Sequence, residues 1–165
     1  MDLQRQISRK LNEEHIAILA LLERFEQALG RLRGEPPAQD DPVWRMLLPQ
    51  LENALRHEVT RHFALEEDHL FPRLHERGEG DLADLLLEDH KVIREVARPL
   101  LDLIGDARDG RLDAPGWRTL KAYGLELAER LGSHAQKEQG ALVPLVDEIL
   151  DEDTDSALAM EYASG

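Results

Sequence analysis

The chain contains four long stretches in which apolar residues recur at helical spacing. In residues 3–33 the apolar stripe includes Leu11, Ile18, Leu22, Phe25 and Leu29, which lie on one face of a helix. Comparable stripes run through residues 42–77, 81–108 and 117–150. The strict alternation that is typical of strands is absent from the sequence. The pattern therefore predicts an all-α protein, folded as an up-down-up-down four-helix bundle.

Residues rich in proline, glycine and acid separate and follow these stretches. Residues 34–41 cannot continue a helix, so we expect Pro42 or Pro49 to open the second helix and Asp81 to cap the third. The acidic run after residue 150 predicts a solvated, disordered C-terminal tail. The predicted organisation is one bundle domain, residues 1–150, and an acidic tail, residues 151–165.

Two of the predicted helices carry a histidine followed by a glutamate four residues later. The pairs are His62 with Glu66 and His134 with Glu138. Residues four apart share one face of a helix, so each pair can bind a single metal ion. One such pair alone is a weak signal, because a lone histidine on an apolar stripe is more often a core residue with one hydrogen bond.

The chain also repeats itself, and each half contains one of these pairs. The sequence Glu13-Glu14-His15 in the first half matches Glu88-Asp89-His90 in the second. Helix pairs related by a pseudo-twofold axis would bring all four histidines to a similar depth, at about 1.5 Å per residue. Four imidazoles and two carboxylates in an apolar core are costly without partners, and a pair of metal ions satisfies them together. The predicted metal ligands are His15, His62, Glu66, His90, His134 and Glu138.

Composition narrows the choice of metal and of partners. The sequence has no cysteine, so any metal must bind nitrogen or oxygen. Imidazole with carboxylate suits iron, manganese or zinc, and we favour iron. The net charge of −14 argues against nonspecific binding to nucleic acid or to anionic membranes. The sequence shows neither an apolar leader nor an apolar run of membrane-spanning length, so we expect a cytoplasmic protein.

The order of the predicted ligands along the chain, H–HxxxE–H–HxxxE, resembles the hemerythrin-like (HHE cation-binding) family over about residues 3–150. The resemblance implies that the six residues bind two iron ions, Fe2+ or Fe3+, with both glutamates bridging and an oxo or hydroxo group between the ions. Oxygen-carrying hemerythrins have a further histidine where this chain has Arg94, and their last carboxylate follows its histidine by five residues rather than four. The pattern is closer to bacterial iron-centre repair proteins and to the iron-sensing domain of a ubiquitin-ligase subunit.

The sequence leaves open whether residues next to the six predicted ligands also belong to the site. In helical projection His69 and Glu58 lie about 20° and 40° from His62. Each could join or support the site, with surface placement as the alternative. Others project well away from the site, and solvent exposure is expected for His57, His75 and Glu67.

Three functions remain open for such a site. The first, which we favour, is a non-haem di-iron protein that binds or senses O2, NO or iron and signals through a protein partner. The second is a di-iron enzyme that acts on peroxide or O2, as a catalase or peroxidase does, or that repairs iron centres. The third is a metal-buffering bundle. The expected small ligand is therefore a diatomic molecule or peroxide.

Overall fold

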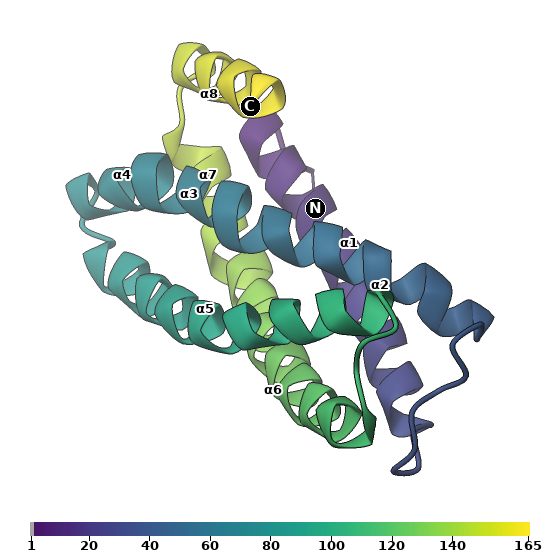
Figure 1. Ribbon diagram of the computed structural model, residues 1–165. Coiled ribbons are helices and arrows are strands. Elements are labelled where there is room, and N and C mark those ends of the chain that lie inside the picture. The colour runs from purple at the N-terminus through teal and green to yellow at the C-terminus, as the bar shows by residue number, and fades with distance from the viewer. Residues whose placement is uncertain (1) are drawn as a thin grey trace.

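The computed structural model describes residues 2–165, and these residues form helices joined by short loops (Figure 1). Four helical rods make up the bundle, as the sequence predicts. The first rod is α1 (Gln6–Gly30) and the third is α5 (Gly80–Arg108). The second rod joins α2 (Pro42–His57), the π-helical turn η1 (Glu58–His62), α3 (Phe63–Leu65), the π-helical turn η2 (Glu66–Leu70) and α4 (Phe71–Glu76). The fourth rod joins α6 (Ala114–Lys137), the π-helical turn η3 (Glu138–Leu142) and α7 (Val143–Ile149).

The start of the second rod follows from its N-cap. Asp41 accepts hydrogen bonds from the backbone N–H groups of Val43 and Trp44 at 2.9 and 3.2 Å, and Pro42 occupies the first helical position, where no N–H is needed. Of the two predicted starts, Pro42 is therefore correct. The prediction for Asp81 is wrong, because α5 already begins at Gly80 and no side-chain cap bond forms there.

Two of the π-helical turns lie at equivalent places in the two halves of the chain. Turn η2 starts at Glu66 and ends two residues before Pro72, and η3 starts at Glu138 and ends two residues before Pro144. Proline has no N–H to donate and clashes with the preceding turn, so a regular α-helix cannot pass through this point unchanged. The wider turn absorbs the proline and begins at the glutamate of each HxxxE pair.

A layer of histidines divides the core of the bundle into two apolar clusters. On α1, His15 lies between Leu11, which belongs to one cluster, and Ile18, which belongs to the other. On α5, His90 lies between Leu86 and Ile93 in the same way. The polar layer is therefore enclosed by packed aliphatic and aromatic side chains from both ends of the bundle.

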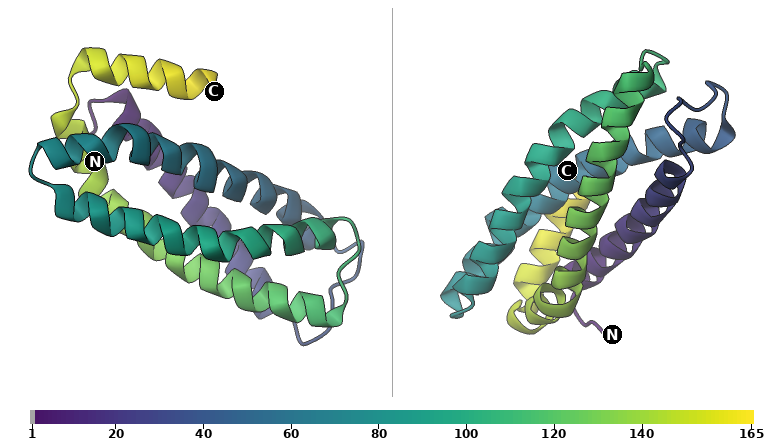
Figure 2. Two further views of the ribbon diagram at one scale, coloured as in Figure 1. Left: turned by 60° about the vertical axis from the view of Figure 1, so that its left-hand side comes forward. Right: turned by 90° about the horizontal axis from the view of Figure 1, so that it is seen from below.

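The C-terminal segment is helical, so the prediction of a disordered tail is wrong. Residues predicted as a disordered tail form helix α8 (Glu152–Ser164), which lies against the start of α1 (Figure 2). Asp151 caps α8 by accepting the N–H of Thr154 at 2.7 Å, and the acidic residues that follow occupy the first turn, where the helix dipole favours negative charge. The acidic run is thus the beginning of a helix. Buried Asp155 then accepts the backbone N–H groups of Gln6 and Ile7, both at 2.9 Å.

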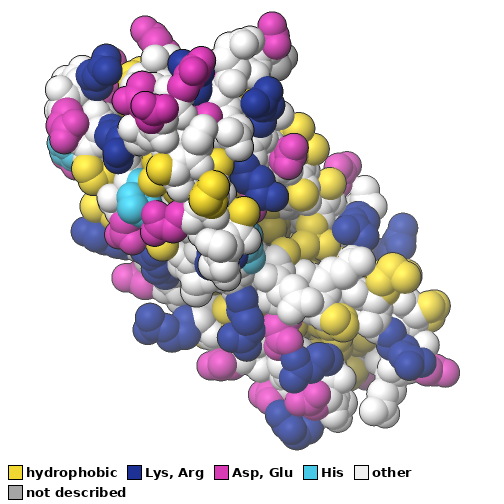
Figure 3. All heavy atoms as spheres, turned by 90° about the horizontal axis from the view of Figure 1, so that it is seen from above, with side chains coloured by type: hydrophobic (Ala, Val, Ile, Leu, Met, Phe, Trp, Pro, Cys, Tyr) yellow, Lys and Arg dark blue, Asp and Glu magenta, His cyan; other side chains and the backbone are white. Residues whose placement is uncertain are grey.

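The outer surface is highly charged. Acidic and basic side chains are interspersed over the face shown in Figure 3, a mixture that is typical of a solvated surface. Within residues 2–165, none of the helices combines the length and the apolar character that crossing a membrane requires.

Candidate metal centre

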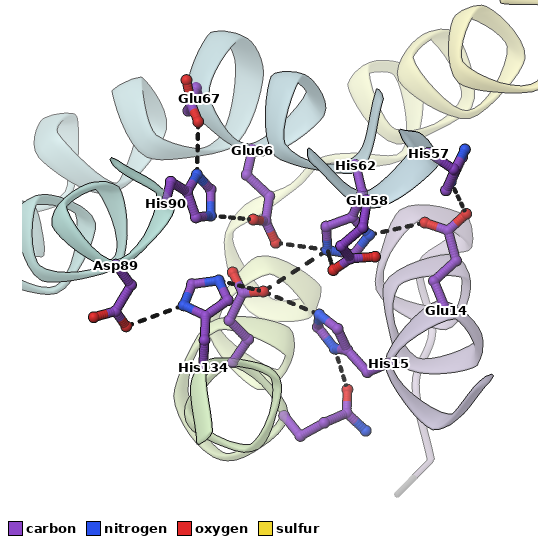
Figure 4. A network of polar contacts seen from close by, with 12 residues as sticks. Glu14, His15, His57, Glu58, His62, Glu66, Glu67, Asp89, His90 and His134 are labelled. Atoms are coloured by element: carbon purple, nitrogen blue, oxygen red, sulfur yellow. Dashed lines mark hydrogen bonds and ion pairs between the residues drawn. The ribbon is translucent and has the colours of Figure 1, made fainter. Parts of the chain in front are cut away.

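All six residues predicted from the sequence converge in the histidine layer, where each is at most 1% exposed. Two come from the first and third rods, on α1 and α5, and the others come from the π-helical turns and the end of α6 (Figure 4). The residues that the structure brings together are His15, His62, Glu66, His90, His134 and Glu138.

These residues form two overlapping groups, each able to hold one metal ion. In each group, two histidines and two glutamates offer ligand atoms within 4.8 Å of one another. Both glutamates belong to both groups. The two oxygens of Glu66 face different halves of the bundle, with Oε2 3.2 Å from His62 Nε2 and Oε1 3.0 Å from His90 Nε2. A carboxylate placed in this way can bridge two ions.

Glu138 completes the arrangement from the fourth rod. Its Oε1 lies 3.0 Å from His15 Nε2 and 3.2 Å from His134 Nε2, so this carboxylate also contacts one histidine of each group. Donor atoms bound to one ion at about 2.1 Å lie about 3 Å apart when they are neighbours and about 4.2 Å apart when they are opposite. The spacings therefore match those of ligands that share an ion.

The outer nitrogen of each histidine is fixed by a hydrogen bond from Nδ1–H to an oxygen that can only accept. The same arrangement orients histidines in metal sites and leaves Nε2 free as a ligand. The acceptors are Gln139 for His15 at 2.6 Å, Glu14 for His62 at 2.9 Å, Glu67 for His90 at 2.6 Å and Asp89 for His134 at 3.0 Å.

These four acceptors follow the internal repeat. Glu14 and Asp89 directly precede the histidines of α1 and α5, and each binds the histidine of the next rod. Glu67 and Gln139 directly follow the glutamates of the HxxxE pairs, and each binds a histidine in the other half. The expectation that Glu67 is solvated is therefore wrong. The repeated acidic pairs were the sequence signal that could have identified Glu14 and Asp89.

With Nδ1 as the donor, the atoms at the centre of the layer are all acceptors. No hydrogen-bond partner is present for His62 Nε2, His90 Nε2, His134 Nε2, either oxygen of Glu66 or Glu138 Oε2 among the described residues. Buried polar atoms almost always have a partner, and lone pairs facing one another at about 3 Å repel. Cations between them would satisfy all of these atoms at once, so the donor set fits a pair of metal ions.

Electrostatics support the same conclusion. Burial and the charge of Glu138 raise the pKa of Glu66 well above its ordinary value. Burial also raises the pKa of Glu138, but contacts with histidines, above all His134, outweigh it and hold this pKa well below the ordinary value. Burial, together with His134, lowers the pKa of His90 to about 4. The negative charge of Glu138 therefore disfavours ionisation of Glu66. A divalent cation between the two carboxylates would stabilise the charged form of both.

The structure also places the neighbouring residues whose role the sequence left open. Glu58 lies inside, 2% exposed, with Oε1 3.7 Å from His62 Nε2. The side chain of His69 is 36% exposed, and its nearest charged partner is Glu161 at 4.0 Å, so it lies at the surface. His75 is exposed, as expected, and binds Asp84.

His57 and Arg94 act on the site through other residues. The side chain of His57 is 36% exposed, in line with the expected solvent exposure, and it also binds Glu14 at 2.7 Å. Arg94 contacts Glu67 at 2.8 Å and lies over the ring of Phe63. It therefore supports the residue that orients His90, and neither group of candidate ligands includes it.

Comparison with known protein families gives one match. The model of the hemerythrin HHE cation binding domain matches residues 6–146, a range that contains all six candidate ligands and their hydrogen-bond partners. No curated protein matched the chain.

Proposed function

Because the chain belongs to the hemerythrin HHE cation-binding domain family, we propose that it is a non-haem di-iron protein that binds or senses a small ligand such as O2 or NO. One ion would be held by His15 and His62 and the other by His90 and His134. Both glutamates, Glu66 and Glu138, would bridge the ions.

The observation that carries this proposal is the sharing of both glutamates between two ligand groups. A mononuclear site bound by His15 and His62 would need only one group and would leave the Nε2 atoms of His90 and His134 buried without partners. Four neutral imidazoles and two carboxylates place two negative charges next to two cations, a balance that suits divalent or trivalent ions. Mixed nitrogen and oxygen donors support iron as the metal.

Enclosure of the site supports a small ligand. The candidate ligands are at most 1% exposed, and the ring of Phe63 stacks on His90 with centroids 3.7 Å apart. A diatomic molecule can reach such a site through small fluctuations of the packing, whereas a larger substrate would need the bundle to open. When bound, iron supplies an open coordination position and redox chemistry. The protein side chains supply the fixed Nε2 lone pairs and an environment that excludes water.

The first test is the metal content and spectrum of protein purified with and without air. We expect close to two iron ions per chain and a near-ultraviolet absorption band after exposure to air. NO or azide should perturb the spectrum at stoichiometric to millimolar concentration. One ion per chain, or zinc alone, would contradict the di-iron proposal.

The second test separates binding from catalysis. We expect peroxide to disappear far more slowly than the roughly 1 to 1000 per second that is typical of enzymes. Peroxide turnover at enzyme rates that is abolished by His134→Ala would instead identify a di-iron peroxidase or catalase. Two bound irons with no response to NO, azide or O2 would leave metal buffering as the function.

A further inference from the structure

A third carboxylate lies at the edge of the candidate metal centre. Glu58 is 2% exposed, and its Oε1 atom has no hydrogen-bond partner within residues 2–165. Its carboxylate lies beside the ring of His62 (Figure 4), with Oε1 3.7 Å from Nε2. A buried carboxylate oxygen without a hydrogen-bond partner is costly, so its position requires an explanation.

We propose that Glu58 is a further metal ligand, bound only to the ion that His15 and His62 hold. This inference rests on the proposed function, and it makes the two ions unequal. The first ion would have two histidines and three carboxylates, whereas the second, held by His90 and His134, would have two histidines and the two bridging carboxylates.

Distances support this assignment. Glu58 Oε1 lies 3.7 Å from His62 Nε2, and Glu138 Oε1, a member of the same candidate group, also lies 3.7 Å from that nitrogen. Both distances fall between those of neighbouring and opposite donors around an ion with bonds of about 2.1 Å. Neither candidate group includes Glu58 as it stands, so its side chain must move toward the centre to share an ion with His62.

The backbone provides a second, independent observation. Glu58 opens η1 and His62 closes it, and such π-helical turns are often found at functional sites. The equivalent residues in the second half, 130–134, belong to the regular helix α6. Arg130, the counterpart of Glu58, is exposed and pairs with Glu126 at 3.0 Å. The extra turn and the extra buried carboxylate therefore occur together, on one side of the pseudo-twofold axis.

The charges that act most strongly on Glu58 come from the site itself. They are the histidines His62 and His15, on the positive side, and the carboxylates of Glu138 and Glu14. Both histidines must be neutral when they bind metal. In the metal-loaded protein, the ions would then balance the charge of Glu58 in place of these histidines.

The inequality of the two ions predicts where an external ligand binds. The ion that His90 and His134 would hold would have one protein ligand fewer, so a small molecule could complete its coordination more easily. Phe63 stacks on His90 and its ring centre lies 5.7 Å from that of His134, which gives this side an apolar wall. O2 or NO should therefore bind on the His90 side.

The test is anaerobic titration with Fe(II), with a competing chelator to resolve the two binding steps. We expect Glu58→Gln to weaken one step by about tenfold or more, as is usual when a metal site loses a supporting group, and to leave the other step within about threefold. The control is Glu52→Gln, on the same rod, whose carboxylate pairs with Arg56 and Arg108 away from the site. This control should change neither step.

A Mössbauer spectrum of the iron-loaded protein provides the second readout. The wild type should show two signals of equal area, and Glu58→Gln should move only one of them. If wild type binds two irons but Glu58→Gln changes neither affinity nor spectrum, the inference is wrong. If wild type itself binds fewer than two ions, it is the proposed function that fails.

Discussion

At the residue scale, the site depends on where each histidine points and on what holds its outer nitrogen. His134 contributes Nε2 to one candidate group and is oriented by Asp89, whereas His75 lies at the surface beside Asp84. We expect His134→Ala to lower the iron content to about half or less, because one ion loses an anchor. Metal analysis of His75→Ala is the matched control, and equal losses in both variants would mean that histidine number rather than geometry matters.

Helical periodicity placed the six candidate ligands on the apolar stripes of their helices, and the HxxxE spacing and the internal repeat then selected them. The same projection placed Glu67 on the solvent side of its rod, yet Glu67 binds His90 on a neighbouring rod. A projection gives the direction of a side chain about one axis, but it does not tell which helix faces it. Hydrogen-bond partners between rods could therefore not be assigned from single helices.

At the element scale, α8 follows the fourth rod in the chain and holds the start of α1 in place through hydrogen bonds. Buried Asp155 accepts two backbone N–H groups that α1 cannot satisfy internally, and thus acts as a cap supplied from a distant segment. We expect Asp155→Ala to lower the free energy of unfolding by about 1 kcal/mol, the usual cost of a lost cap. Denaturant titration should show this loss, with exposed Asp153→Ala on the same helix as the control. A control variant that loses as much would assign the effect to helix charge.

The C-terminal helix also shows the limit of composition as a guide. Judged by charge alone, an acidic run predicts a solvated tail. In the structure, Asp151 caps α8, and the same acidic residues form its first turn, where the helix dipole favours negative charge. Leu158, only 6% exposed, is the single large apolar residue that α8 buries deeply in the bundle. One buried side chain is too weak a periodic signal to predict a helix.

At the scale of the whole molecule, the internal repeat specified the architecture and the position of the site. Two similar halves, each with one HxxxE pair, can satisfy their buried polar residues only by meeting face to face, and the bundle does bring them together. The departures from this symmetry were less predictable. Glu58 and Arg130 occupy equivalent positions, but only the first lies in a π-helical turn that faces the site.

The charge of the whole polar layer predicts opposite responses to pH with and without metal. Burial opposes the charged form of His62, but the surrounding carboxylates, Glu58 and Glu66 foremost, outweigh it and raise its pKa well above the ordinary value. His134 has a raised pKa for the same reason, chiefly through Glu138. In the metal-free protein, the folded state therefore binds more protons than the unfolded state above pH about 6.5, and the stability from these histidines is lost as pH rises through their folded pKa values.

Metal reverses this sign, because His62 and His134 bind it only when neutral and must first release their protons. Between pH 6.5 and 8, we expect the melting temperature of the metal-free protein to fall and that of the iron-loaded protein to rise relative to it. His90, with a pKa lowered to about 4, is already neutral in the folded protein across this range and releases no proton when metal binds. Thermal melts at matched ionic strength measure both curves, and calorimetry of metal binding in buffers with different ionisation enthalpies detects the released protons. Parallel melting curves together with a buffer-independent heat would show that the histidines are already neutral before metal binds.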